Sequence, residues 1–344
     1  MNEKIDIVSL SFTELQAEIL TMQLPKFRAG QIYKWLHSSL VASFDEMTDI
    51  SKDLRLKLSE KFVILGCEIE KKLVSKLDGT VKYLYRLYDG EFIETVVMRY
   101  KYGLSICVST QVGCRMGCKF CASTLNGCVR SLLPSEILGQ IYASQRDLGE
   151  RISHIVLMGM GEPLDNFDNT MKFLSLISDE RGLNIGMRNI SLSTCGIVPK
   201  IYELMDKNLG LTLSVSLHAP NDKIRNTLMP VSKKWSIEEL LTACKLYADK
   251  TGRRVSFEYS LVRGVNDSDA CATELAGRLH GMLCHVNLIP VNEVDETGLS
   301  KPDEKRIRAF QNILEKKGIT ATVRRTLGGD INASCGQLRR GETK

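Results

Sequence analysis

Residues 104–122 read LSICVSTQVGCRMGCKFCA, and this stretch decides the fold. Its first six residues alternate apolar and small polar side chains, as expected for a β-strand with two different faces. Cys114, Cys118 and Cys121 follow in a Cys-x3-Cys-x2-Cys spacing, with glycines before and between them that favour a loop. Iron-sulfur clusters are held by cysteine thiolates, so such a loop can hold three irons of a [4Fe-4S] cluster and leave the fourth iron open.

Two other interpretations of the cysteines stay open at this point. In a helix, cysteines at this spacing would form a buried stripe, although the glycines and the flanking Arg115 and Lys119 argue against a helix. A zinc site completed by Cys128 or Cys107 is also compatible with the sequence. Zinc sites, however, more often use paired Cys-x2-Cys units.

Strand-like and helix-like apolar patterns alternate from about residue 103 onward. We expect strands near 104, 154, 189, 212, 255 and 284, with helices near 135, 168, 199, 236 and 268. This order is typical of parallel strands joined by crossover helices. Each strand also has one apolar and one small polar face, whereas a closed eight-stranded barrel fills its interior with bulky side chains. The sequence therefore predicts an α/β fold, a partial (β/α)6 TIM-like barrel whose polar lumen has room for a cofactor.

Two regions precede the barrel and one follows it. Residues 1–65 are expected to form a small helical domain, because Ser-x-x-Glu capping boxes begin at residues 11 and 43. Residues 66–100 show a period of two, with Asp-Gly turns, and are expected to form a β-hairpin extension. We assign 101–295 to the barrel core and 296–344 to a C-terminal helix, strand and loop.

The composition is that of an ordinary globular enzyme. With 344 residues, 43% of them apolar, the chain can bury a large core. No signal peptide or membrane-spanning run is apparent, so we expect a cytoplasmic protein without a membrane partner. The formal net charge of +5 permits a polyanionic partner without requiring one. Four basic pairs are expected on the solvated surface: Lys233-Lys234, Arg253-Arg254, Arg324-Arg325 and Arg339-Arg340.

The cysteine loop resembles the signature of radical S-adenosylmethionine (SAM) enzymes, including the aromatic Phe120 just before the third cysteine. In that superfamily SAM binds the open iron of the cluster. The segment GMGEP at 159–163 is similar to the superfamily's segment that contacts the SAM amino group. A dinucleotide-binding fingerprint is excluded there because its third glycine is replaced by Leu164.

Four further segments narrow the resemblance to the RNA adenine-C2 methyltransferase family: FRAGQIYKW at 27–35, CVSTQVGC at 107–114, SLHAPND at 216–222 and DINASCGQL at 330–338. Together they span almost the whole chain. The resemblance implies two equivalents of SAM per turnover and a [4Fe-4S] cluster. It implies as substrates 23S ribosomal RNA near the peptidyl transferase centre and transfer RNA at the adenosine following the anticodon. A flavodoxin- or ferredoxin-type electron donor and a monomeric state are further expectations.

The resemblance also assigns roles to Cys335, Cys107 and Glu94. Carbon 2 of adenine is electron-poor and does not attack the methyl group of SAM directly, so a radical route is needed. In the family, the cysteine matching Cys335 is first methylated and then carries a methylene radical that adds to carbon 2. The cysteine matching Cys107 removes the carbon-2 proton and releases the product through a transient disulfide with Cys335. Glu94 matches a carboxylate assigned to proton handling, and an exposed hairpin charge is the alternative.

Seven residues match SAM-contacting positions of the family: Gly161, Glu162, Ser193, Ser216, Leu217, His218 and Asn292. For His218, an ordinary buried core histidine is the alternative. The remaining cysteines are expected to be small buried side chains, namely Cys67, Cys128, Cys195, Cys244, Cys271 and Cys284.

The sequence departs from the family near the reactive cysteine, where Asn332, Leu327 and Gly329 replace more charged residues. Two rival functions are a related methyltransferase acting on adenine carbon 8 and a zinc-stabilised RNA-binding protein without catalysis. The carbon-8 relatives typically have alanine at the position of Pro163 and cysteine at the position of Val112. At both positions this chain follows the carbon-2 pattern.

Overall fold

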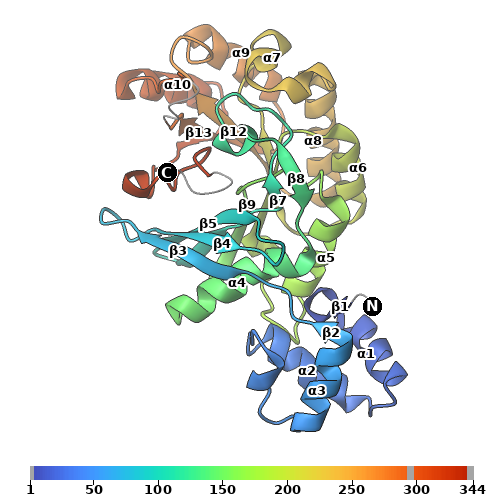
Figure 1. The fold of residues 1–344 in the computed structure, drawn as a ribbon. Helices are drawn as coiled ribbons and strands as arrows, with labels where there is room; N and C mark the ends of the chain where they lie inside the picture. The colour runs from blue at the N-terminus through green and yellow to red at the C-terminus, as the bar shows by residue number, and fades with distance from the viewer. Residues whose placement is uncertain (1–3, 293–297, 339–344) are drawn as a thin grey trace.

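The computed structural model describes residues 4–292 and 298–338 and shows an α/β fold built around one ten-stranded sheet (Figure 1). The strand order is β14-β13-β12-β11-β10-β9-β6-β5-β4-β3. None of the described helices is long and apolar enough to cross a lipid bilayer. The expected basic pair Arg339-Arg340 lies outside the described residues.

The parallel part of the sheet confirms the predicted alternation of strands and helices. Its strands are β6 (Gly103–Cys107), β9 (Ile152–Leu157), β10 (Ile190–Thr194), β11 (Thr212–Ser216), β12 (Val255–Leu261), β13 (Cys284–Pro290) and β14 (Ala321–Val323). The connecting helices are α4 (Pro134–Leu148), α5 (Phe167–Ile177), α6 (Val198–Asp206), α7 (Asp222–Leu228), α8 (Ile237–Thr251), α9 (Asp269–Leu279) and α10 (Glu304–Lys316). The seventh strand, β14, comes from the C-terminal region and pairs in parallel with β13.

The two faces of these strands differ as expected. The apolar side chains of Ile106, Leu192, Val215 and Phe257 are fully buried in the hydrophobic core. Their neighbours on the opposite face are mostly serines. Because side chains alternate across a strand, β6, β10, β11 and β12 pack an apolar face outward against helices and keep a polar face inward.

Residues 66–100, predicted as a β-hairpin extension, form antiparallel strands that continue the same sheet. The strands β3 (Glu68–Val74), β4 (Val81–Arg86) and β5 (Phe92–Tyr100) are antiparallel, and β5 pairs with β6 in a register that sets Val96 opposite Cys107. Gly79 and Gly90 have positive φ angles at the two turns, as their Asp-Gly sequences predict. The extension therefore flanks the first parallel strand directly.

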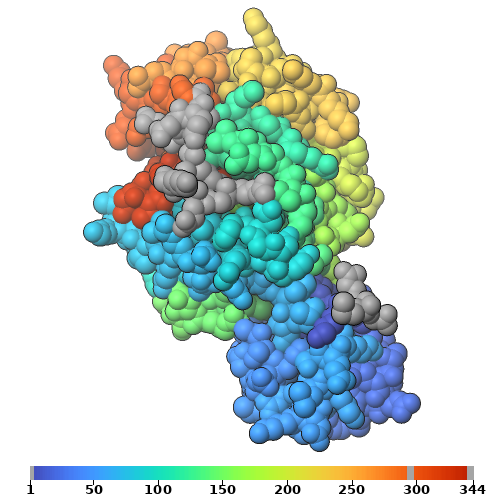
Figure 2. All heavy atoms as spheres, viewed as in Figure 1, coloured from blue at the N-terminus to red at the C-terminus, as the bar shows by residue number. Residues whose placement is uncertain are grey.

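The N-terminal region is a small helical module that projects from the body of the molecule (Figure 2). It contains α1 (Phe12–Thr21), α2 (Phe27–His37) and α3 (Lys52–Lys61), with a short parallel pair of β1 (Ile5–Asp6) and β2 (Phe62–Val63). The predicted capping box at Ser11 is present. The box at Ser43 is also present, but it closes only the short 3-10 turn η2 (Phe44–Glu46).

A buried histidine joins this module to the barrel. Nδ1 of His37, at the end of α2, lies 2.8 Å from the hydroxyl of Tyr142 on α4, and the ring also contacts Tyr33. Burial lowers the pKa of His37 to about 4. The imidazole is therefore neutral at physiological pH, and its protonation opposes this contact.

We expect the stability of the protein to fall as the pH decreases from about 6.5 toward 4. In this window the unfolded chain binds a proton at position 37 that the folded chain does not bind. One such group changes the free energy of unfolding by at most about 1.4 kcal/mol per pH unit. Thermal unfolding of wild type and His37→Gln across this range measures it, and the variant should show a shallower pH dependence. An identical slope in both proteins would contradict this role.

Candidate functional site

The cysteine loop is held by a small hairpin made of β7 (Gln111–Gly113) and β8 (Cys128–Ser131). The backbone N–H of Cys114 donates to the carbonyl oxygen of Gly127 at 2.9 Å. Gly113 has a φ angle of 78°, and a Cβ atom there would lie 2.0 Å from that same oxygen. Only glycine fits this position, so the hairpin fixes where the first cysteine begins the loop.

Cys114, Cys118 and Cys121 line one cavity of about 150 Å³ at the carboxyl ends of the parallel strands. No three His, Cys, Asp or Glu side chains in the described part of the chain are arranged to hold a single metal ion. A multi-iron cluster requires a different arrangement, because each thiolate binds its own iron and the sulfurs stand apart. Three separate sulfurs around one cavity match that requirement.

Burial controls the protonation of these thiols. It raises the pKa of Cys114 to about 12, and it also raises the pKa values of Cys118 and Cys121. In the absence of metal the three groups are therefore neutral. Deprotonation requires a cation in the cavity, and this is the chemistry of a metal-cluster site.

The GMGEP segment at the end of β9 forms one wall of this cavity. A Cβ atom at Gly159 would lie 2.6 Å from the carbonyl oxygen of Val108, and one at Gly161 would lie 2.6 Å from Cβ of Gln111. Gly161 also has a φ angle of 99°. The two glycines thus allow the segment to pass close to the first strand and leave space on the cavity side.

Glu162 lies at the cavity, but its carboxylate is already occupied. The carboxylate accepts hydrogen bonds from the backbone N–H groups of Cys195 at 2.7 Å and Leu164 at 3.0 Å. Burial raises its pKa. The side chain therefore ties GMGEP to the end of β10, a role that the sequence did not reveal.

Ser193, Ser216 and His218 line the same cavity at the ends of β10 and β11. Nδ1 of His218 accepts a hydrogen bond from the backbone of Ser260 at 2.8 Å, which leaves the Nε2 position to carry the proton. Burial lowers the pKa of His218 to about 3, so the ring is neutral. Its ring meets Phe120 edge to face, with centroids 4.6 Å apart, and this contact joins the cysteine loop to β11.

Leu217 does not line the cavity. It is buried, and its backbone N–H donates to the carbonyl oxygen of Glu258. Its side chain follows the apolar parity of β11, which explains why it points away from the lumen. Any SAM contact at this position belongs to the backbone.

The loop that carries Cys335 closes the cavity from the other side. The carbonyl oxygen of Cys335 accepts a hydrogen bond from Nδ2 of Asn292 at 3.0 Å. The next carbonyl, of Gly336, accepts one from the backbone of Ala122 at 2.7 Å. Asn292 and the cysteine loop therefore fix the backbone on the C-terminal side of the Cys335 sulfur.

Cys107 and Cys335 meet at a second, smaller cavity of about 40 Å³, and Cys335 lines both cavities. Both residues are free thiols. Cys107 lies on the polar face of β6, where burial raises its pKa to about 12. The structure therefore brings the two predicted reactive cysteines to one place, with Cys335 at the junction of the two cavities.

Glu94 is buried on β5 and is not an exposed hairpin charge. Its carboxylate lies 2.7 Å from Nζ of Lys82, and Lys82 also donates to the carbonyl oxygen of Asn332 at 3.2 Å. Glu94 lines neither of the two cavities described above. Its contact with the reactive loop runs through Lys82, a residue that the sequence did not single out.

Arg324 is a second residue that sequence reasoning missed. It was expected on the surface as part of a basic pair, yet its guanidinium is largely buried and lines both cavities, whereas Arg325 is exposed. Its pKa is raised chiefly by Cys335, with further contributions from Glu258 and Cys107. Glu258 also lines the larger cavity and accepts hydrogen bonds from Asn287 and Ser256. Alternation along β12 places Glu258 on the polar face of the strand, whereas no sequence pattern distinguishes Arg324 from a surface residue.

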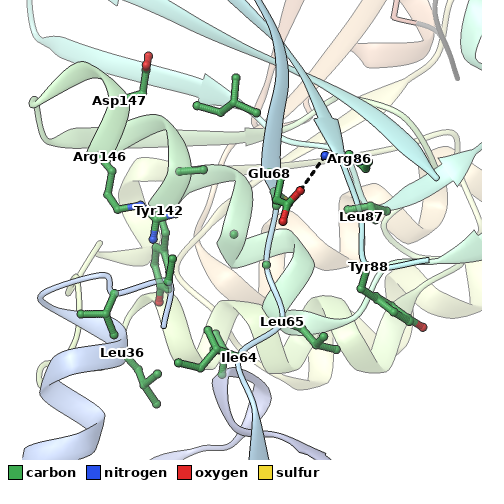
Figure 3. Close-up of a pocket in the computed structure, with 18 of the residues that line it drawn as sticks. Leu36, Ile64, Leu65, Glu68, Arg86, Leu87, Tyr88, Tyr142, Arg146 and Asp147 are labelled. Atoms are coloured by element: carbon green, nitrogen blue, oxygen red, sulfur yellow. Dashed lines mark hydrogen bonds and ion pairs between the residues drawn. The ribbon is translucent and has the colours of Figure 1, made fainter. Parts of the chain in front are cut away.

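A wider hollow of about 790 Å³ lies where the helical module meets α4 and β3–β4 (Figure 3). Leu36, Ile64 and Tyr142 line its apolar side, and Arg86 pairs with Glu68 at its other side. None of the residues expected to bind cluster or SAM, or to react, lines this hollow. Its size alone therefore does not make it the reaction site.

Comparisons with known proteins agree with this geometry. Residues 108–274 match the radical SAM superfamily, and residues 5–64 match the ribosomal RNA large subunit methyltransferase N-terminal domain. The chain is 56% identical to a probable dual-specificity RNA methyltransferase RlmN of Alkaliphilus oremlandii over 98% of both chains. It is 58% identical to one of Clostridium perfringens over 92% of both chains. A crystal structure of a radical SAM methyltransferase from Sphaerobacter thermophilus superimposes with a TM-score of 0.94 at 43% identity, covering 97% of this chain and 99% of that one.

We expect Gly113→Ala to destabilise the protein by about 1–3 kcal/mol, because the added methyl group overlaps a backbone oxygen. Gly30→Ala is the matched control, since Gly30 lies inside α2 with no atom near its missing Cβ. That change should stabilise the protein by about 0.5–1 kcal/mol through helix propensity. Urea unfolding of both variants measures the two effects. Equal stability of Gly113→Ala and wild type would show that the hairpin tolerates a side chain.

We expect Arg324→Met to slow alkylation of Cys107 severalfold at a fixed alkaline pH. Burial and Cys335 raise the pKa of Cys107, and the charge of Arg324 lowers it, so loss of that charge reduces the thiolate fraction. Iodoacetamide labelling of the metal-free protein, followed by peptide mass spectrometry, gives the rate. Arg325→Met removes the neighbouring exposed charge and should have little effect. Equal rates in all three proteins would contradict the electrostatic role of Arg324.

Proposed function

This chain belongs to the RlmN family of radical SAM RNA methyltransferases, and we propose that it methylates carbon 2 of adenosine in RNA. Its relatives are named dual-specificity enzymes. We therefore infer two substrates, 23S ribosomal RNA near the peptidyl transferase centre and transfer RNA at the adenosine following the anticodon. The observation that carries the proposal is the placement of Cys335, which lines both the cavity of the three cysteines and the cavity of Cys107.

The enzyme uses a [4Fe-4S] cluster and SAM, as radical SAM proteins do. Cys114, Cys118 and Cys121 are the residues that would hold the cluster, and the cavity walls formed by GMGEP, Ser193, Ser216 and His218 would hold SAM. When bound and reduced, this pair supplies one-electron cleavage of SAM and so the power to remove a hydrogen atom from an unactivated carbon.

The residues of the chain account for the remaining steps. Asn292 and the cysteine loop hold the backbone around Cys335, so that its sulfur faces the SAM cavity and can accept a methyl group. Arg324 lines the cavity beside this sulfur and contributes a positive charge there, and Cys335 is the largest cause of the raised pKa of Arg324. Cys107 lies in the adjoining cavity, and we expect it to take the carbon-2 proton. After it passes this proton on, its thiolate attacks the Cys335 sulfur and forms a Cys107–Cys335 disulfide. The bond between the Cys335 sulfur and the methylene carbon breaks in this step, and its electron pair leaves with the RNA, where protonation completes the methyl group.

The ion pair of Glu94 and Lys82 supports a role for Glu94 that is exerted through Lys82 and not by direct contact with the substrate. Lys82 holds the carboxylate and the backbone of the Cys335 loop together. We propose that Glu94 receives the proton from the site through this loop region. Glu94, the predicted proton acceptor, thus contacts the loop of Cys335 through Lys82 and lines neither of the two cavities.

A basic hollow next to the site favours entry of RNA from this side. It has a volume of about 780 Å³ and shares Asn292 and Arg324 with the SAM cavity. The exposed cations Arg263, Lys301 and Arg308 line it together with the exposed carboxylates Asp303 and Glu304, so basic side chains predominate there. Phosphate contacts from such residues supply most of the affinity for nucleic acid, and the target adenosine must be turned out of its stack to reach Cys335. We propose the helical module, residues 1–65, as a second RNA-binding part.

The electron donor, the oligomeric state and the cellular location remain predictions. A flavodoxin- or ferredoxin-type protein is expected to supply the electron, and the chain is expected to act as a monomer in the cytoplasm. The carbon-8 and zinc-binding alternatives have no support from the relatives, which are named RlmN.

The decisive experiment is anaerobic reconstitution of the cluster, followed by incubation with SAM, a reductant and either RNA. We expect wild type to form 2-methyladenosine in both RNAs. Cys335→Ala should form none because no sulfur accepts the methyl group, and Cys107→Ala should accumulate a covalent protein–RNA adduct. Nucleoside mass spectrometry and denaturing gels report the two outcomes.

Cys271→Ala is the matched control, because Cys271 is buried in α9 and lines neither reactive cavity. It should form product at the wild-type level. Normal turnover by Cys107→Ala would refute the assignment of Cys107. Methylation at carbon 8, or at neither carbon, would refute the proposed reaction.

A further inference from the structure

Arg225 is a fully buried arginine on α7, and within the described residues its hydrogen bonds go to backbone oxygens. Nε donates to the carbonyl oxygen of Leu217 at 3.1 Å. Nη2 donates to the carbonyl oxygens of Cys195 at 2.7 Å and Ser216 at 3.1 Å. These carbonyls end β10 and β11, so the guanidinium holds together the two strand ends that carry Ser193 and Ser216 at the SAM cavity.

The positive charge of Arg225 lacks a direct counter-charge. Among the described residues no carboxylate forms an ion pair with it, and Nη1 is buried without a hydrogen-bond partner. Asp222, a carboxylate that acts on it electrostatically, already accepts a hydrogen bond from the backbone of Ile237. A buried charge of this kind is costly unless an anion compensates it, so the site indicates an anion that the polypeptide alone does not provide.

The cysteine loop lies directly against the helix that carries this charge. The backbone N–H of Lys119 donates to the carbonyl oxygen of Leu228, the last residue of α7, at 2.9 Å. Cys118 packs against Leu228 and Met229. Cys195, whose carbonyl oxygen binds Arg225, lines the cavity together with the three cluster cysteines. Electrostatically, the charge of Arg225 acts on the thiols of Cys195 and Cys118.

We propose that Arg225 is a positioning residue for the iron-sulfur cluster, and that its charge raises the cluster's reduction potential. A cluster held by three thiolates is net negative, and one-electron reduction makes it more so. In a low-dielectric interior a nearby fixed cation stabilises the reduced form more than the oxidised form. This inference rests on the cluster described under the proposed function.

The test is a redox titration of the reconstituted cluster, followed by electron paramagnetic resonance without SAM or RNA. Arg225→Gln removes the charge and keeps one amide donor, so we expect the reduction equilibrium constant to fall at least tenfold, about 59 mV for a one-electron couple. Arg225→Lys keeps the charge and should stay close to wild type. Lys223→Gln removes an equal charge from the exposed side of the same helix and should also stay close, because water and salt screen it.

Two results would overturn the proposal. One is an unchanged potential in Arg225→Gln that carries wild-type iron and sulfide. The other is an equal loss in Arg225→Lys and Arg225→Gln, which would assign the effect to the carbonyl contacts instead of the charge. A wild-type protein that binds no cluster at all would instead refute the proposed function, so the two failures are distinguishable.

A second measurement does not depend on the Arg225 variants folding. In wild-type protein labelled with ¹⁵N-arginine, electron spin echo spectra of the reduced cluster should show a coupled arginine nitrogen. The coupling should persist in Arg115→Gln, which removes the exposed arginine of the cysteine loop that pairs with Asp165. It should also persist in Arg324→Met, which removes the arginine that lines the cluster cavity, and its loss in that variant would assign it to Arg324. Absence of the coupling, or its loss in Arg115→Gln, would overturn the placement of Arg225 at the cluster.

Discussion

The site depends on the division of the strands β6, β10, β11 and β12 into an apolar outer face and a small polar inner face. Outward side chains such as Val215 and Phe257 pack between the sheet and the helices. Burial of such apolar surface is the main favourable contribution to the free energy of folding. Because the inner faces carry serines, the lumen is not filled by its own side chains. The same alternation thus stabilises the fold and keeps a cavity open at the strand ends.

The polar groups around that cavity are held mainly by backbone hydrogen bonds. Glu162 accepts from two N–H groups, His218 accepts from the backbone of Ser260, and Arg225 donates to three carbonyls. Backbone partners are fixed by the fold and lose little freedom when a cofactor arrives, so the site is organised in advance. Burying these polar side chains costs free energy because they lose their hydrogen bonds to water. Hydrogen bonds to the N–H and C=O groups left unpaired at the strand ends offset this cost.

The sequence predicted the order of strands and helices, the cysteine loop and the polar lumen, because alternation and spacing are local properties. The same reasoning placed Ser193 and His218 at the cavity, since parity and strand ends define their positions. It failed for Arg324, because a basic pair after a strand looks the same whether it is solvated or buried. Lys82 and Arg225 were missed for a related reason. Their roles arise from contacts between segments far apart in the chain, to the loop of Cys335 in one case and to the ends of two strands in the other.

The loop that carries Cys335 is fastened to the turn between β3 and β4. Asp78 accepts from the backbone of Gly328, and Asp330 accepts from Ser75 and from the backbone of Lys76. The loop of Cys335 is therefore held by a hairpin more than two hundred and fifty residues earlier in the chain. The length of that hairpin therefore determines the position of the Cys335 sulfur. An insertion in the hairpin would move Cys335 relative to the cavity without changing any residue of the cluster site.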